Sequence, residues 1–184
     1  MTTLLTIAAI AVAVAFAAVA MGRRRHWLVL PAVVLVAAAI VVPLAMPFSV
    51  AGAWPSAAVA IGLATLGVLA GSPVVGLVLR FAQGGVELGD HGGIVVDDEA
   101  SGSRKATRKE ILRGGATIGF LERLALIGTV LAGQAAAIAV IVAVKGLGRF
   151  SELDDSRARE RFIIGTLTSL TWAGACAAAI MLVA

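Results

Sequence analysis

The feature that most constrains this chain is a set of long stretches without charged side chains. Residues 2–21 carry no charge, and neither do the twenty-one residues 124–144. About twenty helical residues, at a rise of 1.5 Å each, cover the ~30 Å hydrocarbon layer of a bilayer. Only 14% of the residues are charged and 60% are apolar, whereas about 25% are charged in a typical soluble domain. A domain this small cannot bury such an excess, so we expect lipid to surround most of the chain.

The position of the basic residues defines the first two spans. Residues 2–21 precede Arg23, Arg24 and Arg25, whereas a cleaved signal peptide carries its positive charge before the apolar core. We therefore expect an uncleaved first helix whose amino end lies outside the cell, because Lys and Arg favour the cytoplasmic side. A second span, over about 27–46, follows a link of five residues, so the two spans form an antiparallel pair.

A third span begins near Ser56 and reaches about Arg80. Pro73 interrupts it and leaves two interpretations open. Either Pro73 kinks one long helix, or Ser72 caps a new short helix over 73–82.

Residues 81–115 form a long polar stretch that we expect to face the cytoplasm. It contains a short β-like run, Ile94–Val96, followed by a basic part with helical spacing that suits a helix lying on the membrane surface. Basic residues beside apolar spans suit anionic lipid headgroups. Nucleic-acid binding is not predicted, because the interleaved aromatic residues of single-strand binders are missing. The residues expected at anionic lipid are Arg23, Arg24, Arg25, Arg104, Lys105, Arg108 and Lys109.

The next apolar segment allows two topologies. It is either one long crossing or a hairpin folded at Gly133-Gln134, with arms of about 117–132 and 135–150. A single crossing would place the basic residues of 145–161 outside, against the positive-inside bias. The hairpin keeps every Lys and Arg on the cytoplasmic side, although its arms of about 24 Å need local thinning of the bilayer. Gly-Gln is a weak turn signal, but the charge pattern favours the hairpin.

The hairpin would also bring charged side chains to one depth. Glu122 lies eleven residues before Gly133, and Lys145 lies eleven residues after Gln134. Because an ionised group inside a membrane is costly unless it is paired, we expect a Glu122–Lys145 pair, with Arg123 snorkelling to the interface. Such a pair either fixes helix register or serves as a relay or substrate site. The candidate polar site comprises Glu122, Arg123, Gln134, Lys145 and Arg149.

Small residues in the last span, 161–184, indicate close helix packing. Three of them recur every four residues, a spacing that lets helices approach in lipid. Trp172 lies deeper than an interfacial tryptophan and is expected to pack on a neighbouring helix. A hydroxyl-lined substrate groove is the alternative interpretation of this face. The expected packing positions are Gly67, Gly71, Gly165, Thr166, Ser169, Trp172 and Ala173.

The sequence offers little for catalysis. It contains no G-x-S-x-G, H-E-x-x-H, P-loop or C-x-x-C motif. Its single cysteine, Cys176, lies in an apolar run, so there is no disulfide framework. His91 lies among acidic residues that have no recognised metal-loop spacing. No metal or cofactor is predicted, and an enzymatic activity is not favoured.

The second half resembles a family of bacterial, in particular actinobacterial, integral membrane proteins of unknown function. The resemblance covers roughly 115–175 and implies a shared membrane module, but it carries no activity. The matching pieces are I-G-F-L-E-R (118–123), L-A-G-Q (131–134), A-V-K-G-L-G-R-F-S-E-L (143–153) and R-E-R-F-I-I-G-T-L-T-S-L-T-W-A (159–173). The signature positions that it implies are Glu122, Arg123, Lys145, Arg149 and Gly165-Thr166.

Together these features predict an all-α polytopic transmembrane bundle of five or six arms in a bacterial inner membrane. Three N-terminal helices occupy 1–80, the cytoplasmic loop 81–115 and a C-terminal membrane module 116–184. The predicted function is a non-catalytic scaffold or accessory subunit that meets anionic lipid and a protein partner or a second copy of itself. The alternative is a small transporter or channel that uses the intramembrane Glu122–Lys145 pair.

Overall fold

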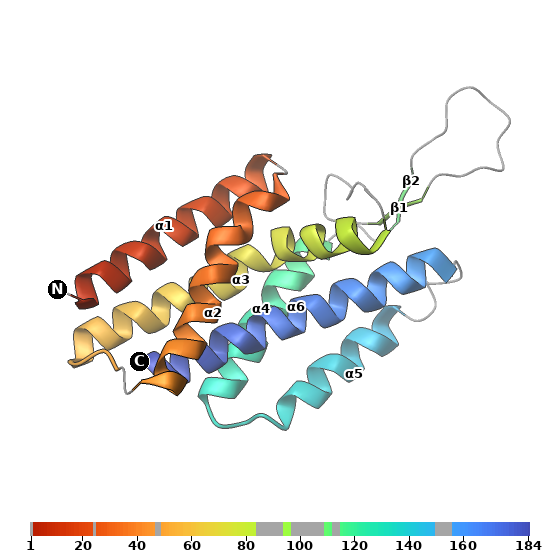
Figure 1. Ribbon diagram of the computed structural model, residues 1–184. Coiled ribbons are helices and arrows are strands. Elements are labelled where there is room, and N and C mark those ends of the chain that lie inside the picture. Colours follow the sequence, from red (N-terminus) through yellow and green to blue (C-terminus); the bar gives the residue numbers. More distant parts are fainter. Residues whose placement is uncertain are drawn as a thin grey trace, which may run out of the picture.

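The fold is a bundle of helices with one short strand pair, seen in the computed structural model of the chain (Figure 1). The structure describes residues 2–23, 25–46, 49–83, 94–96, 109–111, 115–149 and 156–184. Four helical segments are long and apolar enough to cross a membrane, and they are Thr3–Gly22, His26–Ala45, Ala53–Ala82 and Ala158–Val183. The predicted all-helical architecture with apolar spans is therefore confirmed.

The N-terminal helices form as the charge and proline pattern predicts. Helix α1 spans Thr2–Arg23, a short 3-10 helix, η1, spans His26–Val29, and α2 spans Leu30–Ala45. Pro31 lies in the first turn of α2, where its missing N–H leaves no helical hydrogen bond unmade. Helix α3, Ala53–Gln83, continues through Pro73. The kinked-helix interpretation of Pro73 therefore holds, rather than the one with a new helix at 73.

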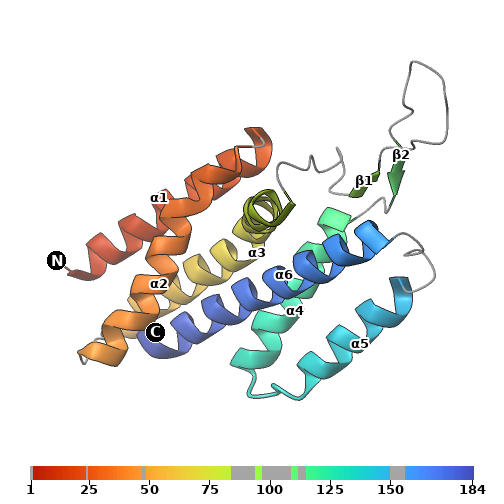
Figure 2. The ribbon, with the colours of Figure 1, turned by 45° about the vertical axis from the view of Figure 1, so that its right-hand side comes forward.

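Two long helices, α3 and α6, form the centre of the bundle, with α6 spanning Ser156–Val183. Helices α1 and α2 cover one side, and α4, Gly115–Leu131, covers the other. Helix α5, Ala137–Arg149, is outermost, and among the described elements its backbone approaches only that of α4 (Figure 2). The C-terminal helices thus enclose a space that α5 borders from outside.

Small residues let the central helices approach closely. A Cβ at Gly62 of α3 would lie 2.5 Å from Cγ2 of Ile10, a buried residue of α1. At Gly67, a Cβ would lie 2.7 Å from Cδ1 of Ile127 in α4 and 3.0 Å from Cβ of Cys176 in α6. Since lipid tails are as apolar as the side chains, such close packing holds helices together in a membrane. Three helices therefore meet at Gly67.

The polar stretch contributes two short strands, β1 (Ile94–Val96) and β2 (Lys109–Ile111), that pair antiparallel with Val95 opposite Glu110. The β-like run at 94–96 is confirmed. The surface helix expected over the basic part is wrong at Lys109–Ile111, because this backbone bonds to β1 instead.

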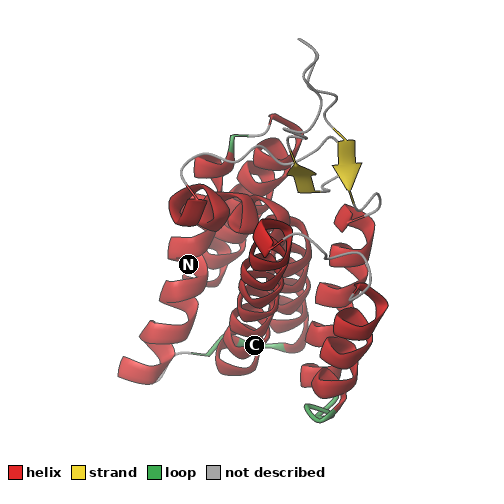
Figure 3. Cartoon of the chain, turned by 90° about the vertical axis from the view of Figure 1, so that its right-hand side faces the viewer, coloured by secondary structure: helices red, strands yellow, loops and turns green. Residues whose placement is uncertain are grey.

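The two ends of the bundle differ in what they carry. Toward the left and bottom of Figure 1 lie the two chain termini and the link between α4 and α5. Toward the right lie the strands, the carboxyl end of α5 and the first turns of α6 (Figures 1 and 3). The backbone N–H of Val50 donates to the carbonyl of Val183 at 3.0 Å, which fixes the link before α3 to the end of α6.

Candidate functional site

A tight turn at 132–136 separates α4 from α5. Gly133 has a φ of 72°, the left-handed conformation that glycine adopts at low cost. The N–H of Gly133 donates to the carbonyl of Val130 at 3.0 Å, and that of Gln134 donates to Thr129 at 2.8 Å. These two bonds form a Schellman motif, which satisfies the last carbonyls of α4. The chain therefore reverses where the hairpin topology predicts.

The reversal brings Glu122 of α4 and Lys145 of α5 together. The Lys145 ammonium group donates to Oε2 of Glu122, and the two side chains are 15% and 11% exposed, respectively. Lys145 also lies 5.9 Å from the ring centroid of Phe162 in α6, a cation–π distance. The predicted Glu122–Lys145 pair is thus present, and it connects α5 to the rest of the bundle.

Arg123 lies inside the bundle instead of reaching the interface, and only 2% of it is exposed. Its Nε donates to the carbonyl of Val68 at 2.8 Å, and a terminal nitrogen donates to Oγ of Ser169 at 3.1 Å. The other terminal nitrogen donates to Oγ of Ser72 at 3.3 Å, and the guanidinium lies 5.2 Å from the Phe120 ring centroid. The snorkelling expectation is therefore wrong, because α3 and α6 supply acceptors within reach.

The bend in α3 helps to supply these acceptors. Figure 2 shows the first half of α3 crossing the view and its second half nearly end-on. Pro73 lies inside the helix and has no N–H for the carbonyl of Leu69, so the helix is interrupted there. The two acceptors from α3, Val68 and Ser72, lie beside this interruption. Arg123 therefore binds α3 where its backbone hydrogen bonding is weakest.

Two glycines make room for the guanidinium. A Cβ at Gly71 would lie 2.4 Å from both Cδ and Nε of Arg123, and one at Gly119 would lie 3.0 Å from a terminal nitrogen. Gly71 thus accommodates a side chain, whereas the sequence suggested contact with another helix backbone.

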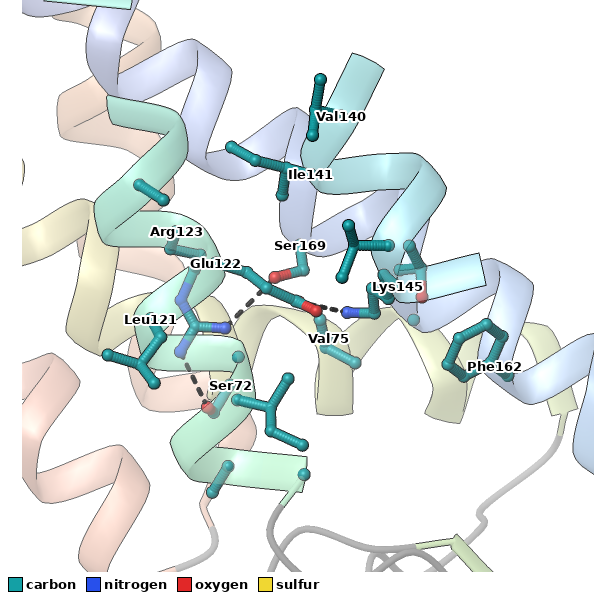
Figure 4. Close-up of a pocket in the computed structure, with 18 of the residues that line it drawn as sticks. Ser72, Val75, Leu121, Glu122, Arg123, Val140, Ile141, Lys145, Phe162 and Ser169 are labelled. Atoms are coloured by element: carbon teal, nitrogen blue, oxygen red, sulfur yellow. Dashed lines mark hydrogen bonds and ion pairs between the residues drawn. The ribbon is translucent and has the colours of Figure 1, made fainter. Parts of the chain in front are cut away.

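A cavity of about 850 Å³ lies between α3, α4, α5 and α6. In Figure 4, Val140 and Ile141 line it from α5, and the Glu122–Lys145 pair crosses it. We call it the central cavity. Its lining comprises Ser72, Val75, Leu79, Gly115, Ala116, Ile118, Gly119, Leu121, Glu122, Arg123, Ala125, Thr129, Ala137, Val140, Ile141, Val144, Lys145, Arg161, Phe162, Gly165, Thr166 and Ser169.

Of the predicted polar site, the structure brings together Glu122, Arg123 and Lys145. Gln134 lies exposed in the turn, away from the lining, so it does not belong with them. Arg149 ends α5, and its side chain is outside the described residues. Sequence reasoning missed Ser72, Phe120 and the carbonyl of Val68, since nothing in the sequence links α3 to α4.

The predicted packing positions divide between core and cavity. Gly67, Trp172 and Ala173 lie in the buried core. Gly165 and Thr166 line the central cavity, and Ser169 both lines it and bonds Arg123.

Most residues expected at anionic lipid cannot be placed. Arg25 is exposed beside η1, and Lys109 lies in β2. The side chain of Arg23 is not described, and Arg24, Arg104, Lys105 and Arg108 lie outside the described residues.

The part of the chain that the structure describes has no group of three His, Cys, Asp or Glu side chains that could hold a metal ion. His91 lies outside that part. Comparison of the chain with protein-family models, curated proteins and solved structures found no match. The geometry of the site is therefore the basis for the function.

Proposed function

We propose that this chain is an integral protein of a bacterial inner membrane and a non-catalytic accessory module. It holds a hydrophobic molecule from the bilayer in the central cavity. The observation that carries the proposal is the position of α5, whose backbone approaches only α4 among the described elements and which borders the cavity with apolar side chains. Ligand pockets typically measure about 300–1,000 Å³ and are mostly apolar, and the central cavity has that size and character.

The lining supports binding rather than catalysis. It contains no histidine, cysteine or aspartate. Its serines, Ser72 and Ser169, accept hydrogen bonds from Arg123. A guanidinium stays protonated in proteins and cannot act as a general base toward them. Glu122, the carboxylate of the lining, is paired with Lys145.

Adjacent residues of α5 provide the test. Ile141 lines the central cavity, and its neighbour Val142 does not. Ile141→Trp should fill the cavity, whereas Val142→Trp adds the same ring outside it. Native mass spectrometry of the protein released from detergent micelles should find one retained lipid per wild-type chain. We expect retention to be lost in Ile141→Trp and kept in Val142→Trp, with unchanged helical circular dichroism in both. Equal retention in both variants, or none in the wild type, contradicts the proposal.

Transport is the second candidate function, favoured by an ion pair that lines a cavity. A carboxylate and an ammonium group inside a membrane are costly and often mark a proton or ion pathway. Vesicles that contain the protein and a pH-sensitive dye should then leak protons faster than empty vesicles, and Glu122→Gln should abolish the difference. Wild-type vesicles as tight as empty ones would exclude proton transport.

A further inference from the structure

The two ends of the central cavity differ in chemistry. Along α5, the lining residues from Ala137 to Val144 are apolar, and Lys145 follows them. Eight residues separate Ala137 from Lys145, a rise of roughly 12 Å along the helix. Arg161 and Phe162 of α6 line the cavity with Lys145. We call the part lined by Glu122, Lys145 and Arg161 the charged end, and the part nearer Ala137 the apolar end.

The charge of the lining is unbalanced. It comprises three cationic side chains, Arg123, Lys145 and Arg161, and one carboxylate, Glu122. Glu122 is paired with Lys145, and Arg123 is bonded to neutral acceptors within the bundle. The site as a whole therefore carries an excess of positive charge. An occupant with a negative group would compensate it, because an opposite charge is worth most where water is excluded.

The charged end lies at a depth suited to a lipid headgroup. The apolar span within α6 begins at Ala158. Arg161 lies three residues further along, roughly 5 Å deeper on the helix axis. Arginine at that depth reaches the level of lipid phosphates, and its planar group can bind a phosphate with two parallel hydrogen bonds.

We infer that the occupant of the central cavity is an anionic phospholipid, with its phosphate at Arg161 and an acyl chain toward Ala137. This inference rests on the proposed function and adds the class of ligand. Arg161 is then the residue that selects for the headgroup, and Val140 and Ile141 of α5 contact the chain.

The test uses two arginines on one helix. Arg161 lines the cavity, whereas Arg159 is exposed and does not. Purified protein is equilibrated with equimolar phosphatidylglycerol and phosphatidylcholine, and the retained lipid is identified by native mass spectrometry. The wild type should retain mainly phosphatidylglycerol. Arg161→Gln should reduce that preference by about tenfold or more, as loss of a charge-assisted hydrogen bond predicts. Arg159→Gln should leave it unchanged.

Two further arms separate the alternatives. Arg161→Lys keeps the charge and should retain most of the preference, which guards against a merely misfolded glutamine variant. Glycerophosphoglycerol, the headgroup without chains, should not displace the bound lipid, because the chain supplies most of the contact. Equal retention of both lipids that Ile141→Trp still abolishes would overturn the anionic selectivity and leave the proposed function standing. Equal losses in Arg159→Gln and Arg161→Gln would also overturn it, and absence of any retained lipid would remove both.

Discussion

The side chain of Arg123 lies against the backbone of Gly71, so close that a Cβ at Gly71 would be 2.4 Å from both Cδ and Nε. The arginine cannot easily move away, because its three hydrogen bonds to Val68, Ser72 and Ser169 hold it in place. This contact joins α4 to the bent part of α3.

Gly71→Ala should therefore destabilise the protein, although alanine is the better helix former. Elsewhere in a helix the same change stabilises by roughly 0.5–1 kcal/mol. Gly128→Ala is the matched control, since a Cβ at Gly128 of α4 meets nothing within 4 Å. We expect opposite signs for the two variants in the free energy of unfolding, measured by SDS titration in mixed micelles. Stabilisation by both would contradict the contact.

Arg123→Lys should destabilise the protein even though it keeps the charge. Lysine has three donors on one nitrogen and cannot match the planar group that reaches α3 and α6 together. We expect a loss on the order of 2 kcal/mol, since hydrogen bonds to charged groups contribute about 1.5–3 kcal/mol and those in membranes somewhat less. Arg159→Lys, at an exposed site of α6, should stay within about 0.5 kcal/mol of wild type in the same unfolding titration.

The role of Arg123 could not be predicted from the sequence. Beside Glu122 and near the start of an apolar run, it resembles an interfacial residue. Its burial depends on the bend at Pro73 and on how α3 and α6 meet α4, which are tertiary relationships. The spacing of small residues indicated that Gly71 is packed, but not that the group packed on it is a side chain.

The hairpin, in contrast, was predictable. The equal distances of Glu122 and Lys145 from Gly133-Gln134 required only helix geometry and the cost of unpaired charge in a membrane. The sequence argument undervalued Gly133, whose use is as a helix C-cap and not as a conventional turn residue. The central cavity was not predictable, because it depends on α5 standing away from α6, and no periodicity encodes that distance.

Breaking the Glu122–Lys145 pair should weaken the protein more than removing it whole. Glu122→Gln or Lys145→Met alone leaves one partner in a mostly buried site with no counter-charge, which is strongly destabilising. The double variant removes both charges. We expect a coupling energy of about 1 kcal/mol or more from a double-mutant cycle of unfolding free energies. Glu160→Gln, at an exposed position of α6, is the control, and strictly additive effects would show that the pair contributes nothing.

Gly133→Ala should destabilise the link between α4 and α5. A residue with a Cβ pays roughly 1–2 kcal/mol in the left-handed conformation that Gly133 adopts, and its φ is 72°. Gly146→Ala, inside α5 with nothing within 4 Å of the added Cβ, should be neutral or stabilising. The loss at Gly133 should appear in the unfolding titration and as faster proteolysis near the turn. Equal effects at the two glycines would argue against the strained cap.

Two exposed residues at opposite ends of the bundle test the proposed orientation in the membrane. Gln134 lies in the turn, and Ser156 begins α6. The positive-inside bias assigns the end with Arg25, Arg159 and Arg161 to the cytoplasm. Gln134→Cys should therefore react with an impermeant maleimide in spheroplasts, whereas Ser156→Cys should react only after the membrane is permeabilised. Cys176 is fully buried, so the background should be low. Labelling of Ser156→Cys from outside would mean that α4 and α5 do not form a hairpin entering from the cytoplasm, or that the whole bundle is inverted. Reaction of Gln134→Cys in the same spheroplasts separates these outcomes, because an inverted bundle would protect it.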